Sequence, residues 1–406
     1  MPNKGFSLKQ SYAAIFLSIL TDVLAGFFLG RSEEMLRMLP GLIVLVPAAL
    51  GMRGQVFASL GSRLGSALHM GTISRFDRRN KTIRNNMYAS MALTIIFSVF
   101  LGLLARAVLL AFGMQSISVI DLVMISLIGG LLSGIIMLFV TLGITFVSFR
   151  RGWDPDNVTS PMITALGDFF TVPSLLLAAF VVTGAAISSN TSVIIIASGL
   201  ALLVFLDIFA VESRKQSERM QLGSYRHIVL QSALVIAFSL LLDSLSGVLI
   251  QFHLAALAAV PILLVLLPAF LEEGGNIGNI MASRLATKLH TKEIKARMEF
   301  TKKIRFEFLN SIMLSVMIFV SVAVMTFLFS VTSGIGGLGV YDIFLVTMLS
   351  GMLLSVIVIV LTYFISIMSY RMNIDPDNSS IPIITSIADV IGVLCLLFVL
   401  HLLAVI

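Results

Sequence analysis

Two aspartates, Asp168 and Asp389, stand in apolar stretches where a carboxylate is costly. Each follows a proline by seven residues, which is about 10 Å along a helix at 1.5 Å per residue, so neither caps a helix N-terminus. A charged residue at the centre of a spanning helix costs about 2.5–3.5 kcal/mol, and such acids usually face a cavity or a partner. The sequence therefore indicates either a wet pathway lined by carboxylates or two buried acids hydrogen-bonded to Ser or Thr.

The composition limits which ion such a pathway would take. The chain has one cysteine and five scattered histidines, so zinc and copper would find few ligands. Carboxylate, carbonyl and water oxygens suit magnesium, calcium or manganese. Magnesium is usually held by one or two carboxylates while it keeps several waters. These residues therefore predict a hard divalent cation, Mg²⁺ first, as the ion.

Both aspartates belong to a motif that occurs twice with an offset of 221 residues. Asp154, Pro155, Asp156, Asn157, Pro161, Thr164 and Asp168 recur at Asp375, Pro376, Asp377, Asn378, Pro382, Thr385 and Asp389. The same offset relates Asp22 to Asp243 and Pro47 to Pro268, whereas it pairs none of the glutamates. A fixed offset is typical of an internal repeat. We therefore expect two copies of one structural unit, both of which keep their aspartates.

Six further aspartates are candidates for the same pathway. Four of them precede the motif helices: Asp154, Asp156, Asp375 and Asp377. They could cap these helices, since Pro161 and Pro382 suit a first helical turn, or they could attract cations at a pore mouth. Asp22 and Asp243 lie too deep in their apolar runs for a cap. We expect those two to pair with a polar group of another helix or to line the pore.

The elements that carry these acids are long apolar runs. Hydrophobic residues make up 58% of the chain and charged residues 12%, whereas soluble proteins average about a quarter charged. Runs of about 20 residues, the length that spans a bilayer, fall near 11–30, 40–62, 87–113, 118–148, 160–187, 191–211, 230–252, 258–283, 308–332, 341–370 and 381–406. The sequence therefore predicts an all-α polytopic membrane protein of about eleven helices.

The number of helices predicts how the repeats are oriented. A five-helix unit ends on the opposite side of the membrane from its start, and the extra run at 191–211 restores the starting side. We therefore expect parallel repeats, related by an axis along the membrane normal. The first five-helix repeat would cover residues 1–189, a linking helix and connector residues 190–227, and the second repeat residues 228–406.

Basic residues predict the orientation in the bilayer. Most of the 27 Lys and Arg residues fall in the N-terminal arm and in loops on that same side, which the positive-inside rule makes cytoplasmic. We expect a multi-pass protein of the cell membrane with its N-terminus inside and its C-terminus outside. This bias accounts for the net charge of +6 and favours contact with lipid headgroups, and no nucleic-acid partner is expected.

These motifs give the sequence a specific resemblance. It resembles the membrane domain of MgtE-type magnesium transporters, and more closely their two-repeat relatives, the eukaryotic solute carriers related to MgtE. The second helix of that family carries a proline and then a Gly-rich, amide-containing segment, as Pro268–Asn276 does here. The fifth helix carries the Asp-Pro motif, a proline, a threonine and an aspartate, as Asp154–Asp168 does. The resemblance implies a magnesium pathway at the pseudo-two-fold interface of the repeats, and a transporter, not an enzyme.

The resemblance also implies which residues meet the ion. Its ion-site positions are Asp168, Asp389, Asn276, Gln55, Thr164 and Thr385. Because single-repeat transporters of this kind build the pore from two chains, one chain would supply both halves here. The sequence also allows assembly of several chains into a higher oligomer.

The two halves of such a pore would be unequal. The second helix of repeat two carries Glu272 and Glu273, whereas that of repeat one carries Arg53. An unpaired arginine in a cation pathway is costly, so we expect Arg53 to pair with Asp168 or Asp22. The alternative is that Arg53 lies behind the pore and bonds backbone carbonyls.

Two other function classes stay open from the residues alone. Two facing aspartates could share a proton and activate water, as in an intramembrane aspartyl protease. A proton-coupled carrier of organic solutes would also place acids in the membrane. Isotope flux into proteoliposomes separates these classes from divalent cation transport.

Overall fold

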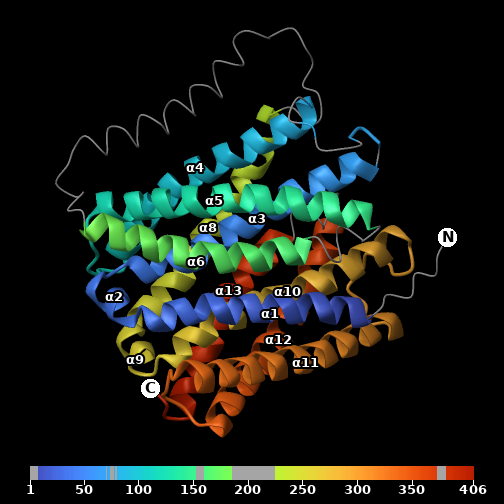
Figure 1. Ribbon diagram of the computed structural model, residues 1–406. Helices are drawn as coiled ribbons and strands as arrows, with labels where there is room; N and C mark the ends of the chain where they lie inside the picture. The colour runs from blue at the N-terminus through green and yellow to red at the C-terminus, as the bar shows by residue number, and fades with distance from the viewer. Residues whose placement is uncertain are drawn as a thin grey trace. The chain divides into compact units, whose positions relative to one another are not determined.

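The computed structural model is helical in every element that it describes (Figure 1). It describes residues 8–69, 71–73, 77, 80–151, 160–184, 225–372 and 381–406. The long helices are α1 (Leu8–Arg31), α3 (Leu42–His69), α4 (Lys81–Ala111), α5 (Val119–Arg150), α6 (Ser160–Gly184), α8 (Tyr225–Phe252), α10 (Ile262–His290), α11 (Lys302–Ser333), α12 (Val340–Arg371) and α13 (Ile381–Leu402). Two short helices, α2 (Glu33–Met38) and α9 (Leu254–Ala259), complete the described part. The expected all-α class is confirmed.

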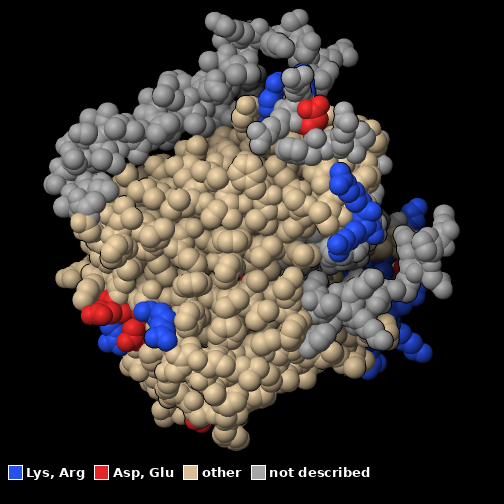
Figure 2. Space-filling model, in the orientation of Figure 1, with Lys and Arg blue, Asp and Glu red and all other residues tan. Residues whose placement is uncertain are grey.

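Many of these helices have the length and composition of membrane spans. Among the described helices, α3, α4, α5, α6, α8, α11, α12 and α13 are long and apolar enough to cross a bilayer. The polar residues Glu272, Glu273 and Asn276 interrupt the apolar stretch of α10, which is not in that group. On the face shown in Figure 2, the surface between the helix ends is almost free of charged side chains. The chain is therefore an integral, multi-pass membrane protein.

Proline marks the start of both motif helices. Pro161 is the second residue of α6 and Pro382 the second residue of α13. Proline is favoured in a first turn because the amide that it lacks would have no partner there anyway. The four aspartates expected just before these helices, Asp154, Asp156, Asp375 and Asp377, lie outside the described residues, as does the linking helix expected at 191–211.

Helix contacts divide the chain into two compact units. Unit one contains Met1–Thr21 and Ala49–Ile236, and α5 packs there against both α4 and α6. Unit two contains Asp22–Ala48 and Ala237–Ile406, and α10 packs there against α11, α12 and α13. Residues 22–48, from the first repeat of the sequence, thus belong to a unit built mostly from the second repeat.

Inside unit two, equivalent elements of the two repeats meet. The short helix α2 packs against the short helix α9, and an offset of 221 residues relates one to the other. Gly26 of α1 contacts Val265 of α10, and Gly247 of α8 contacts Val44 of α3. The same offset relates these two contacts. Reciprocal contacts between equivalent residues are the pattern that a two-fold axis produces.

Candidate ion pathway

In unit one, glycines of α3 bring the Gly-rich segment against the fifth-helix motif. A Cβ atom on Gly54 would lie 3.2 Å from the Thr164 methyl carbon of α6. A Cβ atom on Gly61 would lie 2.5 Å from the end of the Ile163 side chain. Small residues let membrane helices approach closely. Gly54 and Gln55 therefore lie beside the threonine of the motif.

The same arrangement recurs in unit two, between α10 and α13. A Cβ atom on Gly275 would lie 2.6 Å from the Thr385 methyl carbon, where Gly54 and Thr164 are the counterparts. The Thr385 hydroxyl donates a hydrogen bond of 3.4 Å to Asn279 Oδ1. Asn276 Nδ2 donates one of 3.3 Å to Glu273 Oε2. In each unit, the Gly-rich segment of the second helix therefore contacts the threonine of the fifth-helix motif.

The candidate residues of unit one lie deep in the protein. Asp168 follows Thr164 by one helical turn and is 1% exposed. Gln55 Oε1 is buried and has no hydrogen-bond partner among the described residues. Buried polar atoms usually have a partner, either a protein group or an ordered water. Gln55 therefore offers a buried oxygen that a water molecule or a hydrated ion could use.

Unit two gathers three carboxyl groups from three helices. Asp389 of α13 is close enough to Asp243 of α8 and Glu272 of α10 for electrostatic interaction with both. Asp243 also interacts with Glu272 and lies beside the Ser386 hydroxyl. Asp243 is fully buried and Asp389 is 9% exposed. Like charges this close repel each other in a low-dielectric interior, so the cluster needs protons or a cation to compensate it.

The spacing of this carboxylate cluster is wider than that of a closed metal centre. Among the described residues, no three His, Cys, Asp or Glu side chains are close enough to hold one metal ion together. Magnesium tolerates such spacing, because it loses water reluctantly and is commonly held through its hydration shell. The donor set consists of oxygens only, which suits a hard cation.

Arg53 directs its guanidinium group toward α4 and α5. It is 1% exposed, and it donates hydrogen bonds of 3.1 Å to Thr94 Oγ1 and 3.4 Å to Ser98 Oγ on α4. On α5, a Cβ atom at Gly130 would lie 2.7 Å from Arg53 Nη2, so a glycine is needed there. These bonds lead to hydroxyl groups and not to the backbone carbonyls that one alternative expected. The expected pairing of Arg53 with Asp168 or Asp22 stays a prediction.

An aromatic ring fills the corresponding space in unit two. Phe319 takes the position of Ser98, Gly274 that of Arg53 and Gly351 that of Gly130. A Cβ atom at Gly351 would lie 2.4 Å from the Phe319 ring, which also packs against Phe270 with a centroid distance of 5.5 Å. The first repeat thus has an arginine and a serine at the two positions where the second repeat has a glycine and a phenylalanine.

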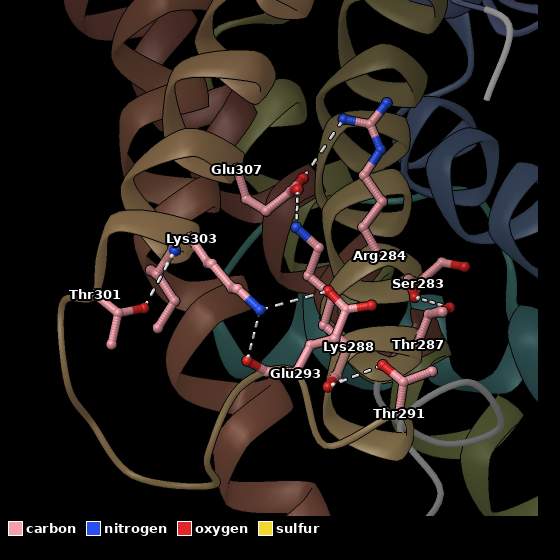
Figure 3. Close-up of polar contacts among 10 residues, drawn as sticks. Ser283, Arg284, Thr287, Lys288, Thr291, Glu293, Thr301, Lys303 and Glu307 are labelled. Carbon is pink, nitrogen blue, oxygen red and sulfur yellow. Dashed lines mark hydrogen bonds and ion pairs between the residues drawn. The ribbon is translucent and has the colours of Figure 1, made fainter. Parts of the chain in front are cut away.

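The far end of α10 is tied to α11 by charge (Figure 3). Glu307 is buried and forms ion pairs with Lys288 and with Arg284, the latter at 3.8 Å. In unit one the equivalent contact is a hydrogen bond of 2.7 Å from Arg63 Nε to Asn86 Oδ1. Both contacts join the second helix of a repeat to its third helix. They hold in place the helix that carries Gln55 or Asn276.

Sequence analysis missed two residues of this site, Ser386 and Asn279. Neither has a polar counterpart in the other repeat, so the repeat comparison could not reveal them. Helical spacing could have done so, because Ser386 precedes Asp389 by three residues and Asn279 follows Asn276 by three. Residues three apart lie on one helix face.

Comparisons with known proteins identify the same two repeats. The family model MgtE, described as a divalent cation transporter, matches residues 46–178 and again residues 267–399. The two matches have the same offset of 221 residues as the motifs, and they contain both the Gly-rich segment and the fifth-helix motif. No solved structure matches the chain significantly.

Curated relatives cover nearly the whole chain. Solute carrier family 41 member 3 of Rattus norvegicus is 26% identical over 403 residues, which cover 93% of this chain and 83% of the relative. Solute carrier family 41 member 2 of Mus musculus is 28% identical over 431 residues, with coverage of 97% and 71%. The human member 2 is 26% identical over 426 residues, with coverage of 98% and 71%. Since the family model matches both repeats, the chain belongs to the MgtE family of divalent cation transporters.

Proposed function

We propose that this protein carries Mg²⁺ across the membrane along a path lined by the second and fifth helices of each repeat. The observation that carries the proposal is the carboxylate cluster of unit two, formed by Asp243, Glu272 and Asp389. Membership of a divalent cation transporter family favours this function over the aspartyl protease and the organic solute carrier. In unit one, Asp168 and the buried Gln55 oxygen would serve the same path.

Electrostatics explains why such a cluster selects a cation. Three carboxyl groups that lie within interaction range in the membrane interior cannot all ionise without a compensating charge. A divalent cation supplies two positive charges at once, while Ser386, Asn276 and Thr385 offer dipoles that reach its water shell. We infer that the ion stays at least partly hydrated, because no three acidic side chains of the described residues are close enough to hold it together, and magnesium is commonly bound by one or two carboxylates with its waters retained.

Flux through purified protein tests the proposal. Proteoliposomes that hold a fluorescent magnesium indicator should take up Mg²⁺ with the wild-type chain. The double variant Asp168→Ala/Asp389→Ala should lose this flux. Its melting temperature should hardly change, because the variant removes costly buried charges. A matched control is Asp121→Ala, which removes an aspartate that bonds Ser118 in the first turn of α5. Wild-type flux in the folded double variant would refute the proposal.

The hydration of the ion needs a separate measurement. A cobalt(III) hexaammine complex has the size of a hydrated magnesium ion but does not exchange its ligands. If the path binds Mg²⁺ through its waters, this complex should compete with Mg²⁺ uptake, and Asp389→Ala should reduce the competition. If a large excess of the complex does not inhibit Mg²⁺ uptake, the site would instead bind the ion after it has lost its waters.

A further inference from the structure

The second helix of each repeat carries a polar stripe that leads away from the proposed ion site. Its members are Gln55, Ser62 and Ser66 on α3 and Asn276, Ser283 and Thr287 on α10. The offset of 221 residues relates the two sets one by one, and the spacing places each set on one helix face. In both helices the amide side chain is half-buried, whereas the two hydroxyl residues that follow it are exposed. Each stripe therefore opens to the surface toward the C-terminal end of its helix.

The surface of these two helices differs from that of the helices around them. A helix that faces lipid exposes large apolar side chains, as α5 does at Phe139 and α12 at Val356. Among the described side chains of α3 and α10, in contrast, no large apolar one is exposed. Leu64 and Leu285, which stand between the exposed hydroxyl residues, are fully buried. Because amide groups are costly in hydrocarbon, the exposed side of each second helix suits water and not lipid.

Two basic residues adjoin the stripe of α10, and an acid of α11 draws them to the other side of the helix. They are Lys288 and Arg284, each of which directly follows a hydroxyl residue of the stripe. Both form ion pairs with the buried Glu307, which Arg284 reaches at 3.8 Å. In Figure 3, Ser283 and Thr287 lie on the side of α10 away from Glu307. Since a fixed positive charge repels a cation, this arrangement keeps the stripe favourable for one.

The first repeat reaches the same local charge without an acid. Ala67 takes the position of Lys288, so Arg63 is the one basic residue of the three equivalent positions. Arg63 Nε donates a hydrogen bond of 2.7 Å to the neutral Asn86, which takes the position of Glu307. The formal charge is therefore +1 in both repeats, from one arginine in unit one and from two basic residues and one acid in unit two. The additional lysine of the second repeat is thus accompanied by an additional carboxylate.

We propose that the two stripes line a water-filled vestibule at the cytoplasmic end of the path, and that Glu307 is a positioning residue that holds Lys288 and Arg284 out of it. The inference rests on the proposed function, because only a path for cations gains from this arrangement. Uncharged hydroxyl groups let a hydrated Mg²⁺ pass without binding it tightly. A unit charge about 10 Å away in water changes the local concentration of a monovalent ion about twofold and that of a divalent ion about fourfold. One lysine in the vestibule would therefore slow uptake several-fold.

Thiol reactivity tests for the vestibule without any transport. Single cysteines would be placed in detergent-solubilised full-length protein that carries Cys395→Ala, and their reaction rates measured with a cationic and an anionic methanethiosulfonate reagent. Ser62→Cys and Ser283→Cys should react with both reagents. Val356→Cys should react slowly although the position is exposed, because hydrocarbon disfavours the thiolate. Leu285→Cys is the buried control. If Ser283→Cys is as slow as Val356→Cys, the stripe faces lipid and there is no vestibule.

The ratio of the cationic to the anionic rate at Ser283→Cys measures the charge in the vestibule. Glu307→Asn leaves Lys288 without its carboxylate and should lower this ratio about fourfold, because each of the two rates changes about twofold in opposite directions. Lys288→Ala should raise the ratio. Both substitutions break the same ion pair, so a purely structural role would give both the same effect. The double variant Lys288→Ala/Glu307→Asn installs the residues of the first repeat and should restore the ratio of the wild type.

Magnesium uptake by the same variants connects the vestibule with transport. Glu307→Asn should slow uptake about fourfold at low salt, and less in 1 M salt, where the Debye length is about 3 Å. The double variant should take up Mg²⁺ as the wild type does. The matched control is Glu293→Gln, which removes an exposed acid that pairs with the exposed Lys303, and it should change neither the rate ratio nor the uptake.

The outcomes separate this inference from the proposed function. An unchanged rate ratio in Glu307→Asn, or a double variant that does not recover the ratio, would overturn the role of Glu307. Rate ratios that respond as expected in a protein that takes up no Mg²⁺ would refute the proposed function alone. If Glu307→Asn does not fold, Lys288→Ala decides, because a ratio that does not rise would contradict the inference.

Discussion

Gly26 of α1 lies so close to Val265 of α10 that a Cβ atom on the glycine would stand 2.0 Å from the valine carbonyl oxygen. The counterpart contact is nearly as close, because a Cβ atom on Gly247 would lie 2.8 Å from the Val44 carbonyl oxygen. In both contacts the obstacle is backbone, which cannot rotate away as a side chain can. These two glycines therefore allow the first helix of each repeat to reach the second helix of the other.

Replacing either glycine with alanine should destabilise unit two. We expect Gly26→Ala and Gly247→Ala each to cost about 1–3 kcal/mol, the usual cost of overpacking, with the larger cost at Gly26. Thermal melting in detergent measures the change. Gly184→Ala is the matched control, because a Cβ atom there would meet nothing within 4 Å. Wild-type melting of both variants would show that the helices do not make these contacts.

Arg53→Gly and Ser98→Phe install the residues of the second repeat, and we expect each to lower the stability alone but not in combination. Arg53→Gly alone opens a cavity, which typically costs about 2–5 kcal/mol for a large buried side chain. Ser98→Phe alone forces a ring against the guanidinium and costs about 1–3 kcal/mol. The double variant should recover most of this loss, because the ring then occupies the arginine's space as Phe319 does in unit two. Strictly additive losses in a double-mutant cycle would contradict this interpretation.

The same double variant distinguishes the two roles considered for Arg53. If the side chain only fills space between α4 and α5, the folded double variant should transport Mg²⁺ with unchanged apparent affinity. If it also compensates an acid of the pathway, its removal should change that affinity. Magnesium uptake at a series of concentrations separates the two results.

Neutralising Asp389 should reduce flux more than neutralising Asp168. Asp389 interacts with two other carboxyl groups, and one of them, Glu272, is replaced by Gly51 in the first repeat. Asp389→Asn therefore removes a charge from the more acidic half of the proposed path. Initial rates of Mg²⁺ uptake, normalised to the amount of reconstituted protein, measure the difference. Equal losses in the two Asn variants would exclude this asymmetry.

Cysteine labelling should show that the repeats are parallel. In a Cys395→Ala background, single cysteines at Thr72 and at Glu293 should react with a membrane-impermeant maleimide from the cytoplasmic face only. Cysteines at Gln115 and at Gly336 should react from the outside only. The offset relates the members of each pair, and all four positions are exposed. Opposite-side labelling within either pair would indicate inverted repeats and would exclude the linking helix from the membrane.

Much of the fold could be predicted from composition and periodicity. Apolar runs of spanning length became the long helices described here, and Pro161 and Pro382 start their helices as expected. The short helices α2 and α9 were missed, because six residues carry too little periodic signal to distinguish a helix from a loop. Their contact with each other also joins residues far apart in the chain, which no local pattern encodes.

The site was predictable in its residue types but less so in its contacts. The repeat offset identified Asp243 and Asp389 separately, but their interaction depends on how α8 and α13 pack, which the sequence does not state. The partners of Arg53 were missed for a similar reason. The rotation of α3 about its axis determines that this long side chain reaches the hydroxyls of Thr94 and Ser98 on α4.

Residues 22–48 pack in unit two with segments that are synthesised much later, and this affects how the protein is made. The Gly41 amide donates a hydrogen bond of 3.0 Å to Gln251 Oε1, 210 residues later in the chain. At translation rates of about 5–20 residues per second, the amide waits roughly 10–40 s for its partner to be made. The early helices must therefore remain in the translocon or the bilayer without their final neighbours. A ribosome that stalls before α8 would leave a nascent chain that quality-control proteases can recognise by its unpartnered helices.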